Sequence, residues 1–107
     1  MIVTTTNEVA GYRIVRHLGV CRGITVRSRS ALGNWAGGWQ SLFGGRLSIY
    51  VRLAEKARQE AFDQMVSQAA DAGATAVLAM RYDANEIMDG ITEVLAYGTA
   101  VLAEPIG

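Results

Sequence analysis

The chain has 107 residues, half of them hydrophobic, and equal numbers of acidic and basic side chains, so its formal net charge is zero. No apolar run approaches the roughly 18 residues of a membrane-spanning helix, the N-terminal residues lack the basic and apolar segments of a secretory signal, and the single cysteine, Cys21, cannot form an internal disulfide. We therefore expect one cytoplasmic domain over residues 1–107.

The first third of the chain predicts strands. Residues 2–6 are rich in β-branched side chains and predict a short strand. In residues 12–30 apolar side chains recur at even positions, and successive strand residues point to opposite faces. We therefore expect a long strand whose even-numbered residues, including Val20, Ile24 and Val26, face the core. Gly19 and Gly23 predict a bulge or bend within it.

Residues 31–45 are rich in glycine, which argues against a stable isolated helix. Large apolar side chains nevertheless recur every three or four residues, which favours a short packed helix or a structured loop. We interpret these side chains as packing or subunit-interface anchors. They are Leu32, Trp35, Trp39, Leu42 and Phe43.

Residues 46–72 predict the clearest helix. One face is apolar at helical spacing and consists largely of alanine, which allows a close approach to its partner. Gly73 stands where a left-handed residue ends a helix. A helix of this length extends over roughly 40 Å. Because that is long for so small a domain, we expect part of it to pack outside its own subunit.

The remaining residues predict two strands and a hairpin. Residues 74–82 read as a strand, and Asp89-Gly90 is a strong signal for a two-residue turn before a final strand over residues 91–102. That final strand is apolar on both faces, which indicates burial on both. Since one helix covers only one face of a sheet, we expect a second copy of the chain to cover the other.

The charges are divided unevenly along the chain. Residues 9–54 contain seven arginines and no acid, whereas residues 55–107 contain nine acids and three basic residues. This pattern is typical of an anion, RNA or lipid-headgroup site on the basic half. It also fits two complementary surfaces that meet within or between subunits, which is the interpretation we favour. Nucleic acid is not an expected partner, because the arginines lack interleaved aromatic residues.

Candidate chemistry is sparse. His17 and Cys21 lie four residues apart, so their Cα atoms are roughly 13 Å apart in a straight strand, too far for a nucleophile and its base. Neither a zinc-type cluster nor a calcium-loop spacing is present, although copies of His17 and Cys21 could converge around a symmetry axis. Gly44-Gly45-Arg46 before the helix is a weak signal for anion binding, and a plain hinge is the alternative. The sequence does not identify a cofactor.

Several short strings together resemble the YbjQ-like family of small bacterial proteins, labelled as heavy-metal-binding and of unknown function. They cover nearly the whole chain in the right order: Thr4-Thr5, Gly44-Gly45-Arg46 with Tyr50, Ala57-Arg58 with Ala61 and Met65, residues 73–77, residues 80–83 and residues 97–101. The resemblance implies a β-α-β-β subunit and a ring pentamer. Residues 72–75 depart from the family's usual Leu-Gly-Ala-Asn, a change that affects a helix end and no chemistry.

We therefore expect an α+β fold, with one long helix on a small antiparallel sheet, assembled as a homopentameric ring. The first functional hypothesis is a binding or scaffold protein, not an enzyme, that takes a small anionic ligand at inter-subunit clefts through Arg27, Gly44, Gly45 and Arg46. The second is a heavy-metal site shared between subunits, with Cys21 and His17 as ligands. The third, an enzyme with an inter-subunit active site, would have only tyrosines, acids and arginines available.

Overall fold

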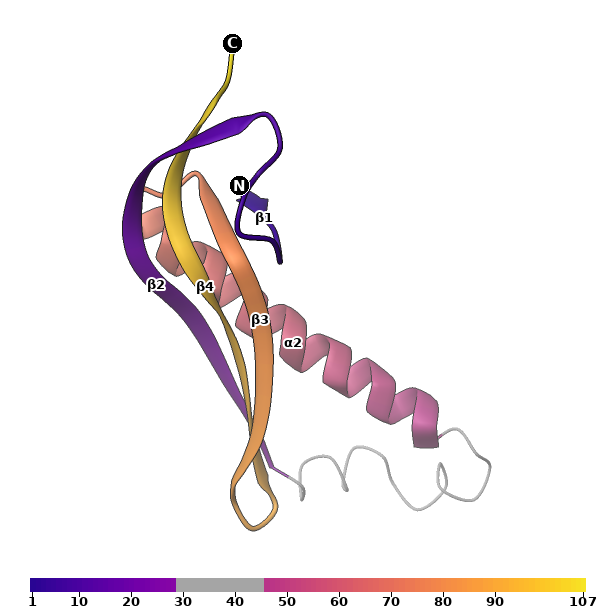
Figure 1. Cartoon of the computed structure of the whole chain (residues 1–107). Coiled ribbons are helices and arrows are strands. Elements are labelled where there is room, and N and C mark those ends of the chain that lie inside the picture. The colour runs from indigo at the N-terminus through magenta and orange to yellow at the C-terminus, as the bar shows by residue number, and fades with distance from the viewer. Residues whose placement is uncertain (29–45) are drawn as a thin grey trace.

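The computed structural model describes residues 1–28 and 46–107, with the helix side chains described from residue 48 onward. Its elements are β1 (Ile2–Val3), β2 (Tyr12–Ser28), α2 (Arg46–Asp71), β3 (Ala76–Met88) and β4 (Ile91–Pro105). The strands form one sheet in the order β1-β3-β4-β2, and α2 packs against one face of it (Figure 1). The predicted α+β fold with one long helix is therefore confirmed. The apolar side chains predicted to anchor residues 31–45 lie outside the described residues.

The sheet is built around β4. Both β2 and β3 pair with β4 in antiparallel orientation, while the two-residue β1 lies parallel to β3. The predicted hairpin joins β3 to β4, and Gly90 in its turn has a φ of 78°, which favours glycine. Strand β3 runs without interruption to Met88, so the predicted strand and the first arm of the hairpin are one element.

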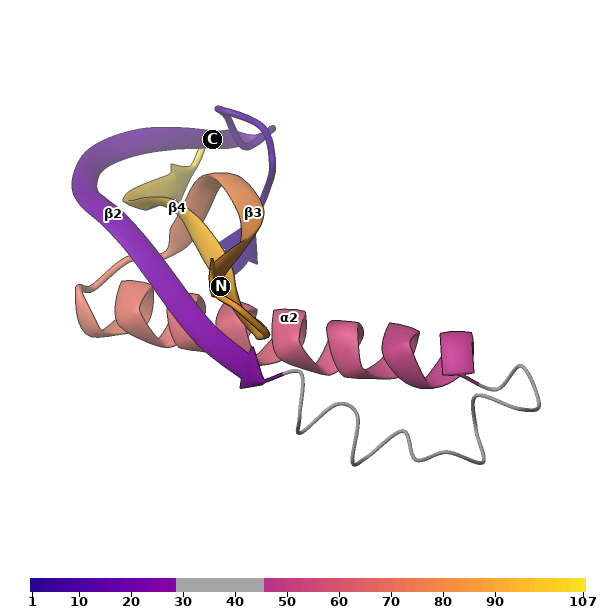
Figure 2. The same ribbon diagram turned by 90° about the horizontal axis from the view of Figure 1, so that it is seen from below.

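The helix ends where the sequence predicts. It stops at Asp71, and Gly73 follows with a φ of 90°, a conformation that ends helices. Four side chains spaced four residues apart are buried against the sheet, namely Ala57, Ala61, Met65 and Ala69. The N-terminal half of α2 extends away from the sheet (Figures 1 and 2). Val51 in this half is 59% exposed.

The predicted burial of β2 is wrong from residue 20 onward. Cys21 and Thr25 are buried beneath the helix, whereas Val20, Ile24 and Val26 are 74%, 43% and 51% exposed. The register of β2 against β4 shifts between His17 and Gly19, where Gly19 has a φ of 108°. A second shift lies between Ile14 and Arg16, and the extra residue at each shift turns the following side chains to the opposite face. The two shifts cancel, so Val20, Ile24 and Val26 share the face of Ile14, away from the helix. The sequence indicated the bulge but not its effect on the facing of the strand.

The face of the sheet opposite the helix is only partly covered. At the end near the N-terminus, Ile2, Val9 and Ile14 pack on a small cluster formed by Ala76, Leu78 and Val101. Further along, Tyr97 of β4 is 37% exposed. Within one chain, the expected burial of β4 on both faces is therefore incomplete.

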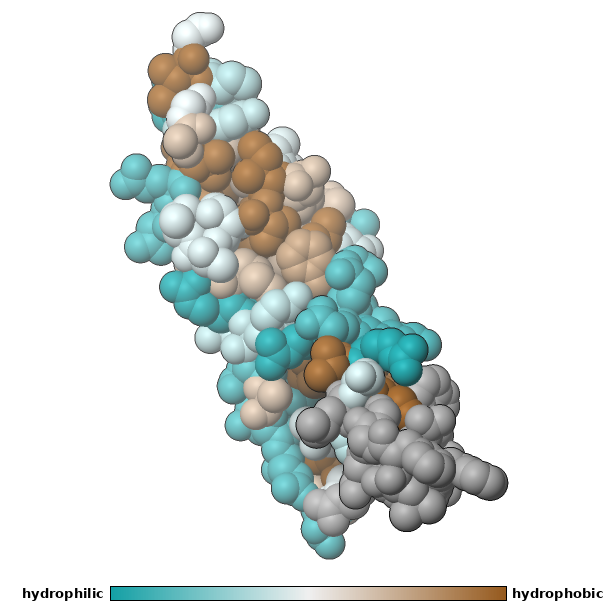
Figure 3. All heavy atoms as spheres, turned by 90° about the vertical axis from the view of Figure 1, so that its right-hand side faces the viewer, coloured by the Kyte–Doolittle hydropathy of each residue, from teal (hydrophilic) through white to brown (hydrophobic). Residues whose placement is uncertain are grey.

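The side of the molecule near β3 also carries apolar side chains. Figure 3 shows them gathered in its upper half. Phe62 and Val66 of α2 and Val3 of β1 are partly buried and pack against the main core cluster. In the described part of the chain, no helix is both long enough and apolar enough to cross a membrane.

Candidate ligand groove

A groove of about 270 Å³ lies between the N-terminal half of α2 and the end of the sheet that carries the β3–β4 hairpin. One wall is formed by Tyr50, Leu53, Ala54 and Ala57 of α2. They recur at i, i+3, i+4 and i+7 in the sequence and therefore share one face of the helix. The other wall is formed by side chains of β2, β3 and β4 that are neighbours across the sheet. Arg27 of β2 pairs with Thr92 of β4, and Ala84 of β3 pairs with Val94 of β4. The described lining consists of Arg27, Tyr50, Leu53, Ala54, Ala57, Arg58, Ala84, Thr92 and Val94.

The groove exists because small side chains face each other where the helix leaves the sheet. Ala54 and Ala57 of the helix lie across from Ala84 of β3 in this lining. The Thr25 hydroxyl donates a hydrogen bond of 3.1 Å to the carbonyl oxygen of Ala57, which fastens the helix to β2 at the inner end of the groove. From Ala57 toward its N-terminus the helix diverges from the sheet (Figure 1), and the groove lining in this part includes the small side chains of Ala54 and Ala84.

Arg27 stands at the groove wall with its charge already matched. Its guanidinium donates to the Glu60 carboxylate, and the two side chains are 29% and 41% exposed. The hydrogen bond from Arg27 is the main cause that lowers the pKa of Glu60 below its ordinary value. Arg27 therefore joins β2 to α2 as well as lining the groove.

Arg58 is the second cation of the groove. Its guanidinium carbon lies 5.3 Å from the centre of the Tyr82 ring, within the range of a cation–π interaction. Burial raises the pKa of Tyr82, and the charge of Arg58 opposes that rise. Among the described residues, the ion pairs are Arg13 with Glu104 and Arg27 with Glu60, so Arg58 has no carboxylate at ion-pair distance.

The lining determines what the groove can do. Its walls are mostly apolar, with two guanidinium groups, and the described lining residues include no carboxylate, imidazole or thiol. Ligand pockets are typically apolar cavities of roughly 300–1,000 Å³ with a few placed polar groups. At about 270 Å³ the groove lies just below that range, so its size and lining suit a small ligand with an apolar body and an anionic end.

Of the predicted anion-site residues, Arg27 lies in this groove. Gly44 and Gly45 lie outside the described residues, and Arg46 begins α2 with its side chain also outside them. Sequence reasoning did not single out Arg58 as a binding residue. Arg58 follows the buried Ala57 and therefore lies at the border of the apolar helix face. This position was the only feature in the sequence that pointed to Arg58 as a groove residue.

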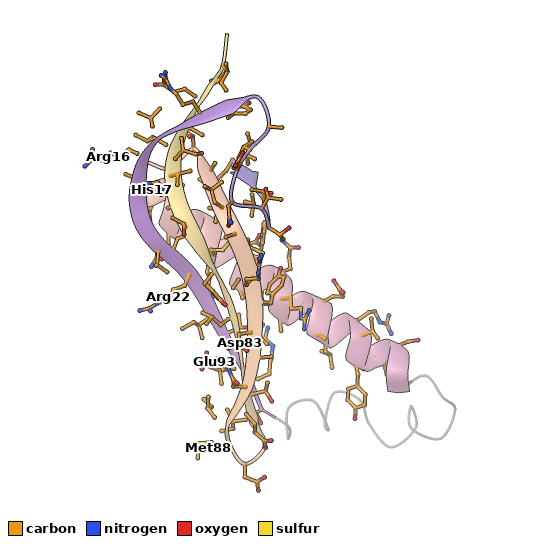
Figure 4. All side chains as sticks on the ribbon, viewed as in Figure 1. Arg16, His17, Arg22, Asp83, Met88 and Glu93 are labelled. Carbon is orange, nitrogen blue, oxygen red and sulfur yellow. The ribbon has the colours of Figure 1, made fainter. Side chains whose placement is uncertain are left out.

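The two predicted metal ligands have different surroundings. Cys21 is 2% exposed, and its thiol donates to the carbonyl oxygen of Gly98 at 3.6 Å. His17 is exposed on the other side of the Gly19 bulge, on the curved part of β2 (Figure 4). Within the ranges 1–28 and 46–107, no three His, Cys, Asp or Glu side chains gather in a way that could hold a metal ion.

Comparisons with known proteins give a consistent result. Residues 1–104 match the YbjQ family model, described as "putative heavy-metal-binding". A UPF0145 protein of Chromobacterium violaceum is 58% identical over 105 residues, covering 98% of this chain and 90% of that protein. Another UPF0145 protein, from Burkholderia mallei, is 52% identical over 106 residues, covering 99% and 96%.

A solved structure shares the fold. It is a protein of unknown function from Pediococcus pentosaceus that belongs to the DUF74 family, with a TM-score of 0.64 and 16% sequence identity. The similarity covers 97% of this chain and 98% of that one. At this identity the likeness concerns the fold alone.

Proposed function

The chain belongs to the YbjQ family, and from this premise we propose that it is a ring-forming homo-oligomeric binding protein that takes a small anionic ligand. The resemblance noted in the sequence is confirmed by the family match and by the UPF0145 relatives. The names of these relatives mention no enzymatic activity. The absence of enzymatic activity, the cytoplasmic location and the assembly remain predictions.

The incompletely covered sheet supports the assembly. Val20, Ile24 and Val26 are exposed on the face away from the helix, and the N-terminal half of α2 extends beyond the sheet. Burying such apolar surface stabilises association by about 25 cal/mol per Å². We expect five subunits, a number that comes from the family resemblance. Native mass spectrometry of untagged protein purified without chelator measures the subunit number, and a monomer at micromolar concentration would overturn this part of the proposal.

The observation that carries the ligand proposal is the apolar groove with Arg58 at its wall. The guanidinium is held over Tyr82 and has no carboxylate partner among the described residues. A ligand carboxylate could pair with Arg58 while its hydrocarbon part fills the space beside Ala54 and Ala84. We propose that a neighbouring subunit closes the open side of the groove, which would make the site an inter-subunit cleft.

Hexanoate is a suitable probe, with hexanol as the uncharged comparison. We expect saturable shifts of the Ala84 and Thr92 amide resonances in nitrogen–proton correlation spectra with hexanoate, and weaker binding of hexanol. Arg58→Gln should weaken hexanoate binding at least fivefold. Arg52→Gln removes a charge from α2 outside the groove lining and serves as the matched control.

A variant that fills the groove provides a second test. Ala54→Leu adds apolar volume at an exposed helix position and should exclude hexanoate without loss of helix content. Ala70→Leu, also exposed on α2, controls for added surface hydrophobicity. If hexanoate binds Ala54→Leu and Arg58→Gln as it binds the unmodified protein, the groove is not an anion site.

A heavy-metal site shared between subunits is the second candidate, favoured by the description of the family. Its proposed ligands are Cys21 and His17 from different copies. The burial of Cys21 argues against it, since the thiol would have to leave its bond to Gly98. Elemental analysis of the purified protein decides the matter. Metal in a fixed ratio to subunits that is lost in Cys21→Ala and His17→Gln would support this site, and an unchanged metal content would exclude it.

A further inference from the structure

The two outer edges of the sheet differ in how they are protected. On β2, the backbone amides of Arg22 and Ile24 donate to the side-chain oxygens of Gln68 and Gln64, at 2.7 Å and 3.1 Å. These two helix side chains therefore accept the hydrogen bonds that the edge amides of β2 would otherwise donate to another strand. An edge capped in this way does not accept a further strand.

The opposite edge, on β3, is protected over only part of its length. The Thr4 amide donates to the Val77 carbonyl, and the amides of Ala79 and Met80 donate to the carbonyls of Thr6 and Thr4. Beyond them, residues 81–88 are all exposed, and no described strand pairs with their outer side. Proteins protect such an edge with charged side chains, bulges or a covering element.

The end of the sheet that carries this edge is acidic. We define the acidic hairpin as residues 82–93, which contain four acids and no basic residue. Ile87 and Met88 near its tip are 53% and 62% exposed, so the hairpin also carries apolar surface. Because identical acidic edges repel each other, this composition disfavours the pairing of two hairpin edges with one another.

A complementary surface lies on β2. We define the outer face of β2 as Val20, Arg22, Ile24 and Val26, which all point away from the helix. The three apolar members are exposed, and Arg22 is exposed and has no ion pair in the described ranges. Figure 4 shows Arg22 on β2, with Asp83 and Glu93 on the hairpin strands. Strand β4 separates Arg22 from Asp83, so the two side chains are roughly 10 Å apart in strand spacing and do not pair within the subunit.

We propose that the acidic hairpin of one copy docks on the outer face of β2 in the next copy, with Arg22 facing Asp83 and Ile24 facing the apolar tip. This inference rests on the proposed ring assembly and identifies its interface. The two surfaces are different parts of the subunit, so the contact is heterologous, and repeating it generates a ring when the rotation closes. The same contact covers the open edge of β3.

Charge reversal tests the pairing. Arg22→Glu and Asp83→Arg should each raise the dissociation constant of the assembly at least tenfold, because each places like charges together. The double variant restores opposite charges at every interface and should recover the subunit number of the unmodified protein. Native mass spectrometry measures that number, and far-ultraviolet circular dichroism checks that each variant is folded. Arg16→Glu and Asp71→Arg, both at exposed positions outside the acidic hairpin and the outer face of β2, are the matched controls.

The outcomes separate this inference from the proposed function. If the unmodified protein is a monomer, the assembly itself is wrong. If it assembles but both single variants retain the full subunit number, the assembly stands and this interface is wrong. Single variants that dissociate and a double variant that does not recover would also overturn the pairing of Arg22 with Asp83.

A cysteine pair distinguishes a heterologous contact from a two-fold one. The variant with Ile24→Cys and Ile87→Cys should form, on oxidation, a ladder of covalent species up to the full ring. Ile24→Cys alone should form no dimer, because position 24 meets position 87 and not its own copy. A covalent dimer of Ile24→Cys would show that β2 faces β2 and would overturn the head-to-tail arrangement.

Discussion

Gly23 of β2 lies so close to Ala61 of α2 that a Cβ atom on Gly23 would stand 2.0 Å from the Ala61 carbonyl oxygen. The same added atom would be 2.7 Å from the backbone nitrogen of Met65. Such contacts are with backbone, which cannot move aside as a flexible side chain does. The strand and the helix therefore meet at a point where only glycine fits, and the alanines of the helix stripe make that approach possible.

Gly23→Ala should therefore destabilise the protein. Overpacking a tight contact typically costs about 1–3 kcal/mol, and the backbone overlap at Gly23 favours the upper end of that range. Chemical denaturation followed by circular dichroism measures the free energy of unfolding. Ser67→Ala, at an exposed helix position, is the control and should change stability by less than about 0.5 kcal/mol. An unaffected Gly23→Ala would mean that helix and strand are further apart than described.

The capping of the β2 edge by glutamine side chains can be tested by hydrogen exchange. In Gln68→Ala the amide of Arg22 loses its partner, while the amide of Ile24 keeps its bond to Gln64. A hydrogen bond of this kind contributes about 0.5–1.5 kcal/mol, so protection at Arg22 should fall by roughly fivefold. The Ile24 amide in the same sample is the internal reference. Equal loss of protection at both amides would indicate a general loosening of the helix instead.

The Arg27–Glu60 pair makes stability depend on pH. The pKa of Glu60 is lowered in the folded protein, chiefly by its hydrogen bond with Arg27. A lowered carboxylate pKa contributes stability that is present above the unfolded pKa and is lost as the pH falls through the folded pKa. The difference in unfolding free energy between the unmodified protein and Glu60→Gln should therefore be largest near pH 7 and shrink in acid. Denaturation curves between pH 7 and pH 3 measure it, with Glu55→Gln as the comparison, and a constant difference would contradict the role of the pair.

The thiol of Cys21 should be unreactive in the folded protein. Burial raises its pKa, and the thiol donates to the Gly98 carbonyl in the core, so the thiolate that attacks a disulfide reagent is scarce and shielded. We expect slow reaction with Ellman's reagent under native conditions and rapid reaction of one thiol per chain in denaturant. Rapid reaction without denaturant would show that Cys21 is accessible, which would strengthen the shared metal site.

The sequence by itself determined which segments form the helix and the main strands, the end of the helix and the turn of the hairpin. Gly73 set the end of the helix, Asp89-Gly90 set the hairpin, and the alanine stripe set the face of α2 that meets the sheet, because each of these signals is local in the chain. The strong family resemblance also lay in short strings along the chain. The position of Arg27 in a groove beside the stripe could not be deduced, since it depends on how the helix crosses the strands.

Only the tertiary structure decided which face of β2 is buried. Register shifts between Ile14 and Arg16 and between His17 and Gly19 each reverse the alternation, and Val20, Ile24 and Val26 face outward although their pattern predicted burial. The tertiary structure also decided the contacts of Gln64 and Gln68 with the β2 edge and the position of Arg58 over Tyr82. These contacts join residues that are distant in sequence. Periodicity specifies that a strand has two different faces, but the packing of the helix on Gly23 determines which one becomes the core.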